Sequence, residues 1–97
     1  MKPYSFYAYN AMRSHFMLND QSPERSKAIA LSCEACTAAL SKESDKMLKI
    51  LKEIYTSPDN LAQATKDAAI KYGIELVSMW TVIGRVERNF AIARGLI

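Results

Sequence analysis

Glycine and proline are scarce in this chain, and their scarcity restricts the folds that the chain can adopt. Only three residues of each type occur among the 97, whereas a sandwich or barrel of short strands needs a turn about every ten residues. Apolar residues make up 49% of the sequence and charged residues 24%, as in an ordinary globular protein. We therefore expect an all-α protein, a compact bundle of four to five helices.

The composition also restricts the cellular compartment and the kinds of partner that we expect for the protein. The chain lacks the run of about 18 uninterrupted apolar residues that a membrane-spanning helix needs. It begins with one lysine before an aromatic stretch broken by Asn10, Arg13 and His15, which does not resemble a signal peptide. We expect a cytoplasmic protein without a membrane partner. The net charge of +3 is compatible with nucleic acid but also with many other partners.

Two start signals define the helices of the front section. Pro3 stands near the first position of a predicted helix over residues 3–18, where a missing amide proton costs nothing. Ser22 is placed as the N-cap, and Pro23 as the first residue, of a second helix that runs to about Leu40. Both helices carry enough apolar residues at helical spacing to pack in a core.

A third helix is predicted over residues 42–55, with Ser41 as its cap. Its apolar residues recur at the i, i+3, i+4 and i+7 spacing of one helix face. Lys42, Lys46 and Lys49 lie on the opposite side. Such a lysine stripe is usually a solvated face, although it can touch phosphate if the domain binds nucleic acid.

The stretch 56–60 is the clearest loop in the chain. Pro58 stops the preceding pattern, and Ser57 or Asp59 can cap the next helix. No flexible linker or internal repeat accompanies the loop, so we interpret it as a joint inside one domain. The predicted parts are a front section, 1–57, and a terminal helical pair, 59–95, within a single domain, 1–97.

The terminal pair has the pattern of a helix-turn-helix. A short helix begins at Leu61 and ends at Gly73, the residue type best suited to a left-handed cap. A second helix starts near Glu75 or Leu76 and runs to about Arg94. Two helices joined by a tight turn that holds glycine are typical of the motif that presents its second helix to the major groove.

Apolar spacing around the turn supports the same interpretation. Ala69 stands four residues before Gly73, where two helices cross closely and a larger side chain would hold them apart. Ile74, Met79 and Val82 occupy the places where apolar residues pin the second helix to the first.

The stretch 72–88 (YGIELVSMWTVIGRVER) resembles the helix-turn-helix of sigma-factor region four and of small phage transcription activators of the ArpU/RinA type. Residues 46–55 (KMLKILKEIY) resemble the helix before that motif, so the resemblance covers roughly 41–94. It implies a small DNA-binding transcriptional regulator of phage or mobile-element origin. It would place these residues on the groove-facing side of the second helix: Glu75, Val77, Ser78, Thr81 and Arg85.

The sequence departs from these families in charge. Family members commonly carry Arg or Lys at the positions of Val77, Thr81 and Gly84, which leaves this helix with few groups for base edges or phosphates. The remaining cations can contact phosphate or simply form a solvated face. The predicted DNA-binding set is Lys66, Lys71, Val77, Ser78, Thr81, Arg85 and Arg88.

Aromatic residues suggest protein partners. A tryptophan in the middle of a helix, as Trp80 is, is more often a core or interface anchor than a base-stacking group. Tyr4 and Tyr7 belong to an aromatic first helix that can pack on a second copy, giving a homodimer. The alternative function is therefore a helical protein-interaction module without DNA binding, in which Val77, Met79 and Trp80 anchor a partner such as RNA polymerase.

Residues for catalysis or for a cofactor do not form a recognisable pattern. Cys33 and Cys36 make a CxxC, but within a predicted helix and with only His15 as a further good ligand. His15 and Asp20 have no nucleophile placed beside them by any motif. We expect no enzyme, no metal and no cofactor. A metal-binding or redox pair of Cys33 and Cys36 at a dimer seam stays open as a further alternative.

Overall fold

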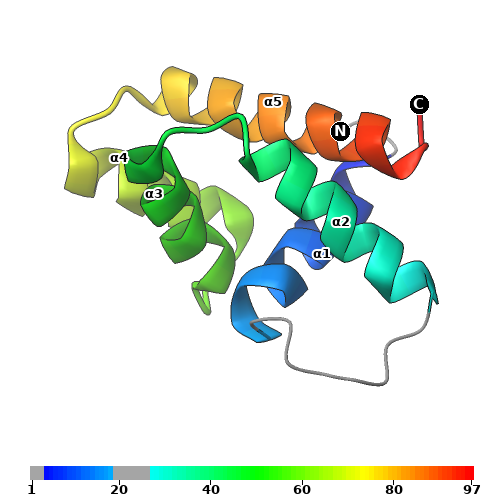
Figure 1. Cartoon of the computed structure of the whole chain (residues 1–97). Coiled ribbons are helices and arrows are strands. Elements are labelled where there is room, and N and C mark those ends of the chain that lie inside the picture. The colour runs from blue at the N-terminus through cyan, green and yellow to red at the C-terminus, as the bar shows by residue number, and fades with distance from the viewer. Residues whose placement is uncertain (1–3, 19–26) are drawn as a thin grey trace.

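The computed structural model describes residues 4–18 and 27–97, and over these ranges it contains five α-helices and no strand (Figure 1). The prediction of an all-α bundle is confirmed. The helices are α1 (Ser5–Leu18), α2 (Lys27–Leu40), α3 (Asp45–Thr56), α4 (Leu61–Tyr72) and α5 (Leu76–Arg94). The longest helix, α5, contacts α1, α2 and α4, while α3 packs against α1 and α4.

The ends of α1 and α2 agree with the sequence where they can be compared. A hydrogen bond closes the first turn of α1, in which the amide of Ala8 donates to the carbonyl of Tyr4 at 2.9 Å. α2 ends at Leu40 as predicted. The predicted starts at Pro3 and at Ser22 lie outside the described residues.

The N-cap of α3 is Ser44, so the prediction of Ser41 was wrong. The Oγ atom of Ser44 accepts a hydrogen bond from the amide of Met47 at 3.2 Å. Ser44 has the extended backbone that an N-cap requires, and Asp45 follows it at the positive end of the helix. Ser41 instead donates its hydroxyl to the carbonyl of Ala38 at 2.8 Å, and so belongs to the end of α2.

The N-cap of α4 is Asn60 rather than Ser57 or Asp59. The Oδ1 atom of Asn60 accepts from the amide of Gln63 at 2.8 Å. The hydroxyl of Ser57 is used elsewhere, because it accepts the amide of Asp59 at 3.1 Å in a local turn. The loop was therefore predicted correctly, but its last residue caps the helix.

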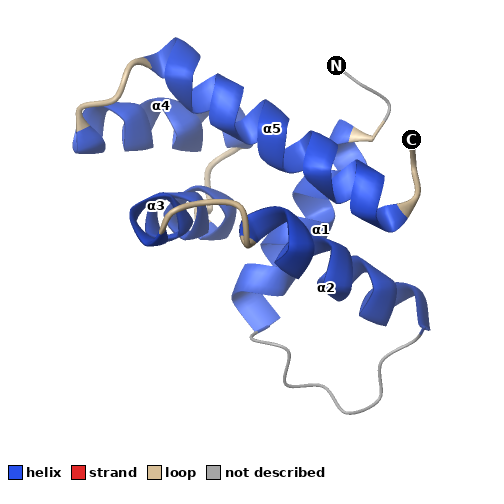
Figure 2. Ribbon diagram, turned by 45° about the horizontal axis from the view of Figure 1, so that its top comes forward, coloured by secondary structure: helices blue, strands red, loops and turns tan. Residues whose placement is uncertain are grey.

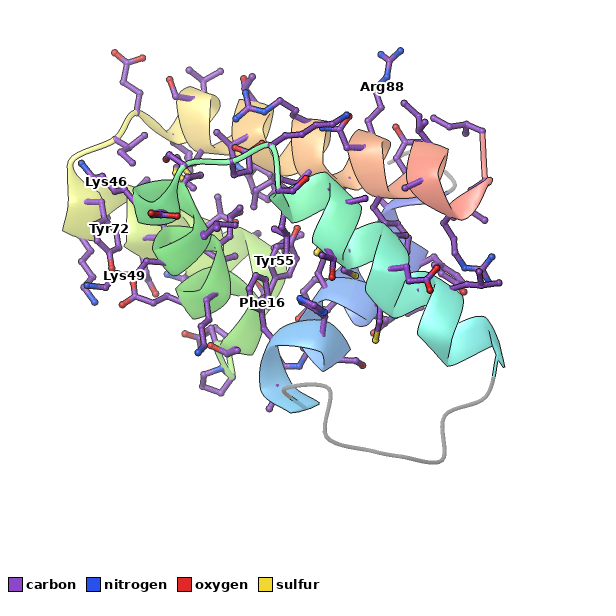
Figure 3. All side chains as sticks on the ribbon, viewed as in Figure 1. Phe16, Lys46, Lys49, Tyr55, Tyr72 and Arg88 are labelled. Carbon is purple, nitrogen blue, oxygen red and sulfur yellow. The ribbon has the colours of Figure 1, made fainter. Side chains whose placement is uncertain are left out.

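All five helices contribute to one core. The apolar face predicted for α3 is confirmed, with Ile50, Leu51, Ile54 and Tyr55 buried. Phe16 of α1 stacks on Tyr55 with ring centroids 6.1 Å apart, near the middle of the molecule (Figure 3). The largest fully buried side chains include Tyr55, Phe90, Met12, Ile50, Leu51, Met79 and Ile83.

One arginine of α1 closes the end of α3. The Nη1 atom of Arg13 donates to the carbonyls of Tyr55 at 3.1 Å and Ser57 at 2.6 Å. A cation is favourable there because the C-terminal end of a helix carries a partial negative charge.

Among residues 4–18 and 27–97, no helix is long and apolar enough to span a membrane.

Candidate nucleic-acid interface

The turn between α4 and α5 depends on a glycine with a positive φ. Gly73 has φ 66° and ψ 35°, in the left-handed region that residues with a Cβ rarely adopt. The amide of the next residue, Ile74, donates to the carbonyl of Ala69 at 2.9 Å. This is a Schellman-type ending, and it turns the chain directly into α5. The turn lies at the end of the molecule opposite the C-terminus (Figure 2).

Small and apolar residues hold the two helices together across the turn. Ala69 is 5% exposed, Met79 is fully buried and Val82 is 9% exposed, while Ile74 packs against the core at its edge. These are the four residues that the sequence assigned to this packing. The start of α5 at Leu76 and its end at Arg94 also agree with the prediction.

The outer face of α5 is open to solvent. Val77, Thr81, Gly84 and Arg88 are exposed and follow one another at helical spacing, with Ser78 exposed beside them. Arg88 points away from the helix (Figure 3). The hydroxyl of Thr81 donates to the carbonyl of Val77 at 2.9 Å. A helix face that is exposed along several turns is accessible to a large partner.

Arg85 forms an ion pair within the molecule. Its Nε and Nη2 atoms donate to the two carboxylate oxygens of Glu43 at 3.0 and 2.6 Å. The hydrogen bonds to Glu43 raise the pKa of Arg85 above its already high ordinary value. The side chain of Glu43 is only 3% exposed and that of Arg85 is 50% exposed. The pair ties the loop between α2 and α3 to α5 and neutralises one of the predicted phosphate-binding cations.

Lys71 is also paired, with a carboxylate of α3. Its Nζ atom lies 2.9 Å from Glu53, and the hydroxyl of Tyr72 donates to the other oxygen of Glu53 at 2.5 Å. The hydrogen bond from Tyr72, followed by that from Lys71, lowers the pKa of Glu53. The same contact raises the pKa of Lys71.

Two predicted cations face solvent without such a partner. Lys66 on α4 and Arg88 on α5 are exposed, and neither forms a salt bridge within the part of the chain that the structure describes. Sequence reasoning missed Glu43 and Glu53 because they stand 42 and 18 residues from their partners. No local pattern connects residues at such separations.

The first turns of α5 expose apolar side chains. Leu76 is 42%, Val77 68% and Trp80 38% exposed, and we call these three residues the α5 tip. Ile70, near the end of α4, is 72% exposed. Trp80 thus keeps more than a third of its surface in solvent, as an anchor for a partner would. The prediction of Met79 as a further anchor was wrong, because Met79 is fully buried in the core.

The two tyrosines predicted to bind a partner are used within the fold of this chain. Tyr4 is 8% exposed. Tyr7 is 42% exposed, but its hydroxyl lies 3.2 Å from that of Ser32 and 3.5 Å from Nη2 of Arg94. The hydrogen bond to Ser32 and the nearby guanidinium lower the pKa of Tyr7. Phe6, at 70% exposure, offers the larger aromatic surface on α1.

The remaining chemical candidates are dispersed. Cys33 is partly buried and Cys36 is buried, both on α2. His15 packs edge-on against Phe16 with ring centroids 5.5 Å apart, and Asp20 lies outside the described residues. Within residues 4–18 and 27–97, no three His, Cys, Asp or Glu side chains gather where they could hold a metal ion.

Comparison with known proteins adds no relative to this picture. No family model, no curated protein and no solved structure matches the chain. The resemblance of residues 41–94 to sigma-factor region four and to phage activators therefore stays a prediction.

Proposed function

We propose that this protein is a small cytoplasmic regulator that binds double-stranded DNA through a helix-turn-helix formed by α4 and α5, and that it is not an enzyme. The observation that carries the proposal is the exposed outer face of α5, which directly follows the Gly73 turn. The buried contacts of Ala69, Met79 and Val82 keep this helix in place while its opposite side stays accessible. A helix so presented suits insertion into a major groove.

The exposed side chains have distinct roles in this proposal. Ser78 and Thr81 carry hydroxyls that can bond base edges, and Val77 can contact a thymine methyl group. Lys66 and Arg88 supply phosphate contacts. Arg85 holds α5 in position through Glu43 more than it attracts DNA. With so few unpaired cations on this face, we expect modest affinity for random DNA.

Fluorescence anisotropy with a random-sequence duplex, titrated over salt concentration, tests this function. Wild type should bind with an affinity that falls steeply with salt through counterion release. Arg88→Ala should weaken binding, whereas Arg88→Lys should retain most of it because the charge is kept. Absence of binding by wild type even at low salt would remove the DNA-binding proposal.

The α5 tip favours a second candidate, a protein-interaction module without DNA binding. Leu76, Val77 and Trp80 present an apolar surface that water does not favour. RNA polymerase is the example of a protein partner that we propose for this module. If the tip binds polymerase, co-sedimentation should persist at high salt and be lost in Val77→Ser, an exposed substitution that leaves the core intact. Equal binding by Val77→Ser would argue against this role.

A further inference from the structure

The exposed side of α3 carries a row of lysines. Lys46, Lys49 and Lys52 lie on the side of the helix opposite its four buried residues, and we call them the α3 lysine face. Lys42 is exposed just before the helix. None of these four lysines forms a salt bridge with another described residue. Lys49 also attracts the carboxylate of Glu53 without forming a salt bridge with it, so the four lysines together keep a surplus of positive charge that can attract an external anion.

The neighbouring carboxylates of Glu43 and Glu53 form their hydrogen bonds with other parts of the chain. Glu43 is turned into the molecule by Arg85, with 3% of its side chain exposed. Glu53 accepts hydrogen bonds from Tyr72 and Lys71, both at the end of α4. Asp45 remains exposed in the first turn of α3. The lysines therefore outnumber the acidic groups left to oppose them.

The outer face of α5 has a different electrostatic character. Arg88 is its exposed cation without a salt bridge, because Arg85 is paired with Glu43. Figure 3 shows Lys46 and Lys49 beside Tyr72 at the α3–α4 end of the molecule, away from Arg88. The unpaired positive charge of the described chain is thus concentrated on α3.

We infer that the α3 lysine face binds the sugar-phosphate backbone of DNA and supplies the electrostatic attraction that α5 lacks. This inference rests on the proposed DNA-binding function, and it assigns phosphate binding to a surface other than the predicted recognition helix. Lysine is a flexible, hydrated point charge that suits phosphate without requiring a fixed geometry. From Lys46 to Lys52 the face spans about 9 Å of helix, enough to meet more than one phosphate.

A nucleic acid fits this face better than a lipid surface does. Membrane-binding helices combine basic residues with large exposed apolar ones that enter the bilayer interface. None of the large hydrophobic residues found exposed in the described chain belongs to α3. The face between the lysines instead carries polar residues such as Asp45 and Thr56.

The decisive experiment compares two double variants that remove the same charge. Lys46→Gln/Lys49→Gln alters α3, and Lys66→Gln/Arg88→Gln removes the same charge from the phosphate contacts proposed for α4 and α5. All four positions are exposed, and glutamine keeps helix propensity, so circular dichroism should show both variants folded. Anisotropy with a random-sequence duplex gives the slope of log affinity against log salt. We expect the α3 variant to reduce that slope by about two units.

Each outcome separates this inference from the function on which it rests. If wild type binds and the α3 variant keeps its full salt slope, the inference is wrong while DNA binding stands. A salt slope that falls no more in the α3 variant than in the Lys66→Gln/Arg88→Gln variant would show that α3 does not supply the main electrostatic attraction, and would also overturn the inference. If wild type fails to bind DNA at low salt, both proposals fall. Binding to phosphatidylserine vesicles in place of DNA would assign the lysines to a membrane instead.

Discussion

The hydroxyl of Tyr55 is a buried polar group without compensation. Tyr55 is fully buried, and its hydroxyl has no hydrogen-bond partner within the described part of the chain. Burial, assisted by the negative charge of Glu87, raises the pKa of Tyr55. The ring is therefore useful for packing against Phe16, while its oxygen costs stability.

Replacing Tyr55 with phenylalanine should stabilise the protein by about 1 kcal/mol, because it removes an unsatisfied hydroxyl and keeps the ring. The gain should grow in alkali. The folded state holds the Tyr55 proton, whereas the unfolded state loses it near pH 10, so the stability of wild type declines as the pH rises above that value. Urea unfolding at neutral and alkaline pH measures both effects. A less stable Tyr55→Phe would indicate that the hydroxyl has a partner.

Arg85 should prove to be a stabilising residue. Arg85→Ala leaves the carboxylate of Glu43 buried without its partner, which generally costs 1–3 kcal/mol. Since half of the Arg85 side chain is in solvent, we expect a loss near the lower end, about 1 kcal/mol. Adding Glu43→Gln should recover part of it, because a neutral amide tolerates burial better. A double-mutant cycle by thermal unfolding checks this, and additive losses would contradict the pairing.

At the scale of elements, glycine has opposite roles at two places in the same helical pair, in the interior of α5 and in the turn before it. Gly84 lies inside α5, with open space where a Cβ would be. Gly73 has a positive φ that only glycine adopts without strain. The same residue type is therefore a weakness in one place and a requirement in the other.

Gly84→Ala should stabilise the protein by about 1 kcal/mol through helix propensity, raising Tm by roughly 4–8 °C for a domain of this size. Gly73→Ala should destabilise it by about 1 kcal/mol, since alanine is strained in the left-handed region. Scanning calorimetry of the two variants beside wild type measures the contrast. Equal shifts of the same sign would show that the turn does not depend on glycine.

Sequence patterns predicted the helices better than they predicted the contacts between side chains. The bounds of α4 and α5 follow from Gly73 and from apolar spacing, so they could be read in advance. Ser41 and Ser44 are equally good caps by residue type, and only the backbone of the folded chain distinguishes them. The candidate site shows the same division. The outer position of Val77 was implied by the family resemblance, and Arg88 was predicted either to contact phosphate or to lie on a solvated face. The pairing of Arg85 with Glu43 arises from tertiary packing.

At the scale of the whole molecule, the described surface divides into faces of different chemistry. The α3 lysine face is cationic, the α5 tip is apolar, and Phe6 projects from α1 with 70% of its surface exposed. These features come from different helices, so a protein of this size can engage more than one partner. Substitutions on one face should leave the other faces unchanged.

We predict that Phe6 contributes to a homodimer through α1. Wild type at high micromolar concentration should scatter light as a dimer, and Phe6→Ser should shift the equilibrium towards the monomer, because an exposed aromatic ring favours burial. Tyr7→Phe serves as the control, since the Tyr7 hydroxyl is used within the chain. A monomeric wild type would refute the prediction.

The contact between Tyr7 and Arg94 joins the first helix to the last. The guanidinium of Arg94 lies 5.9 Å from the Tyr7 ring centroid, and Ser5 donates to Glu87 at 3.1 Å, so α1 begins beside the later turns of α5. Because α1 and α5 are neighbours, the same packing of helices is compatible with another order of the helices along the chain. A circular permutant opened in the loop between α3 and α4, with α5 linked to α1, could retain the same neighbours. Evolution or design could thus rearrange this chain without redesigning its interior.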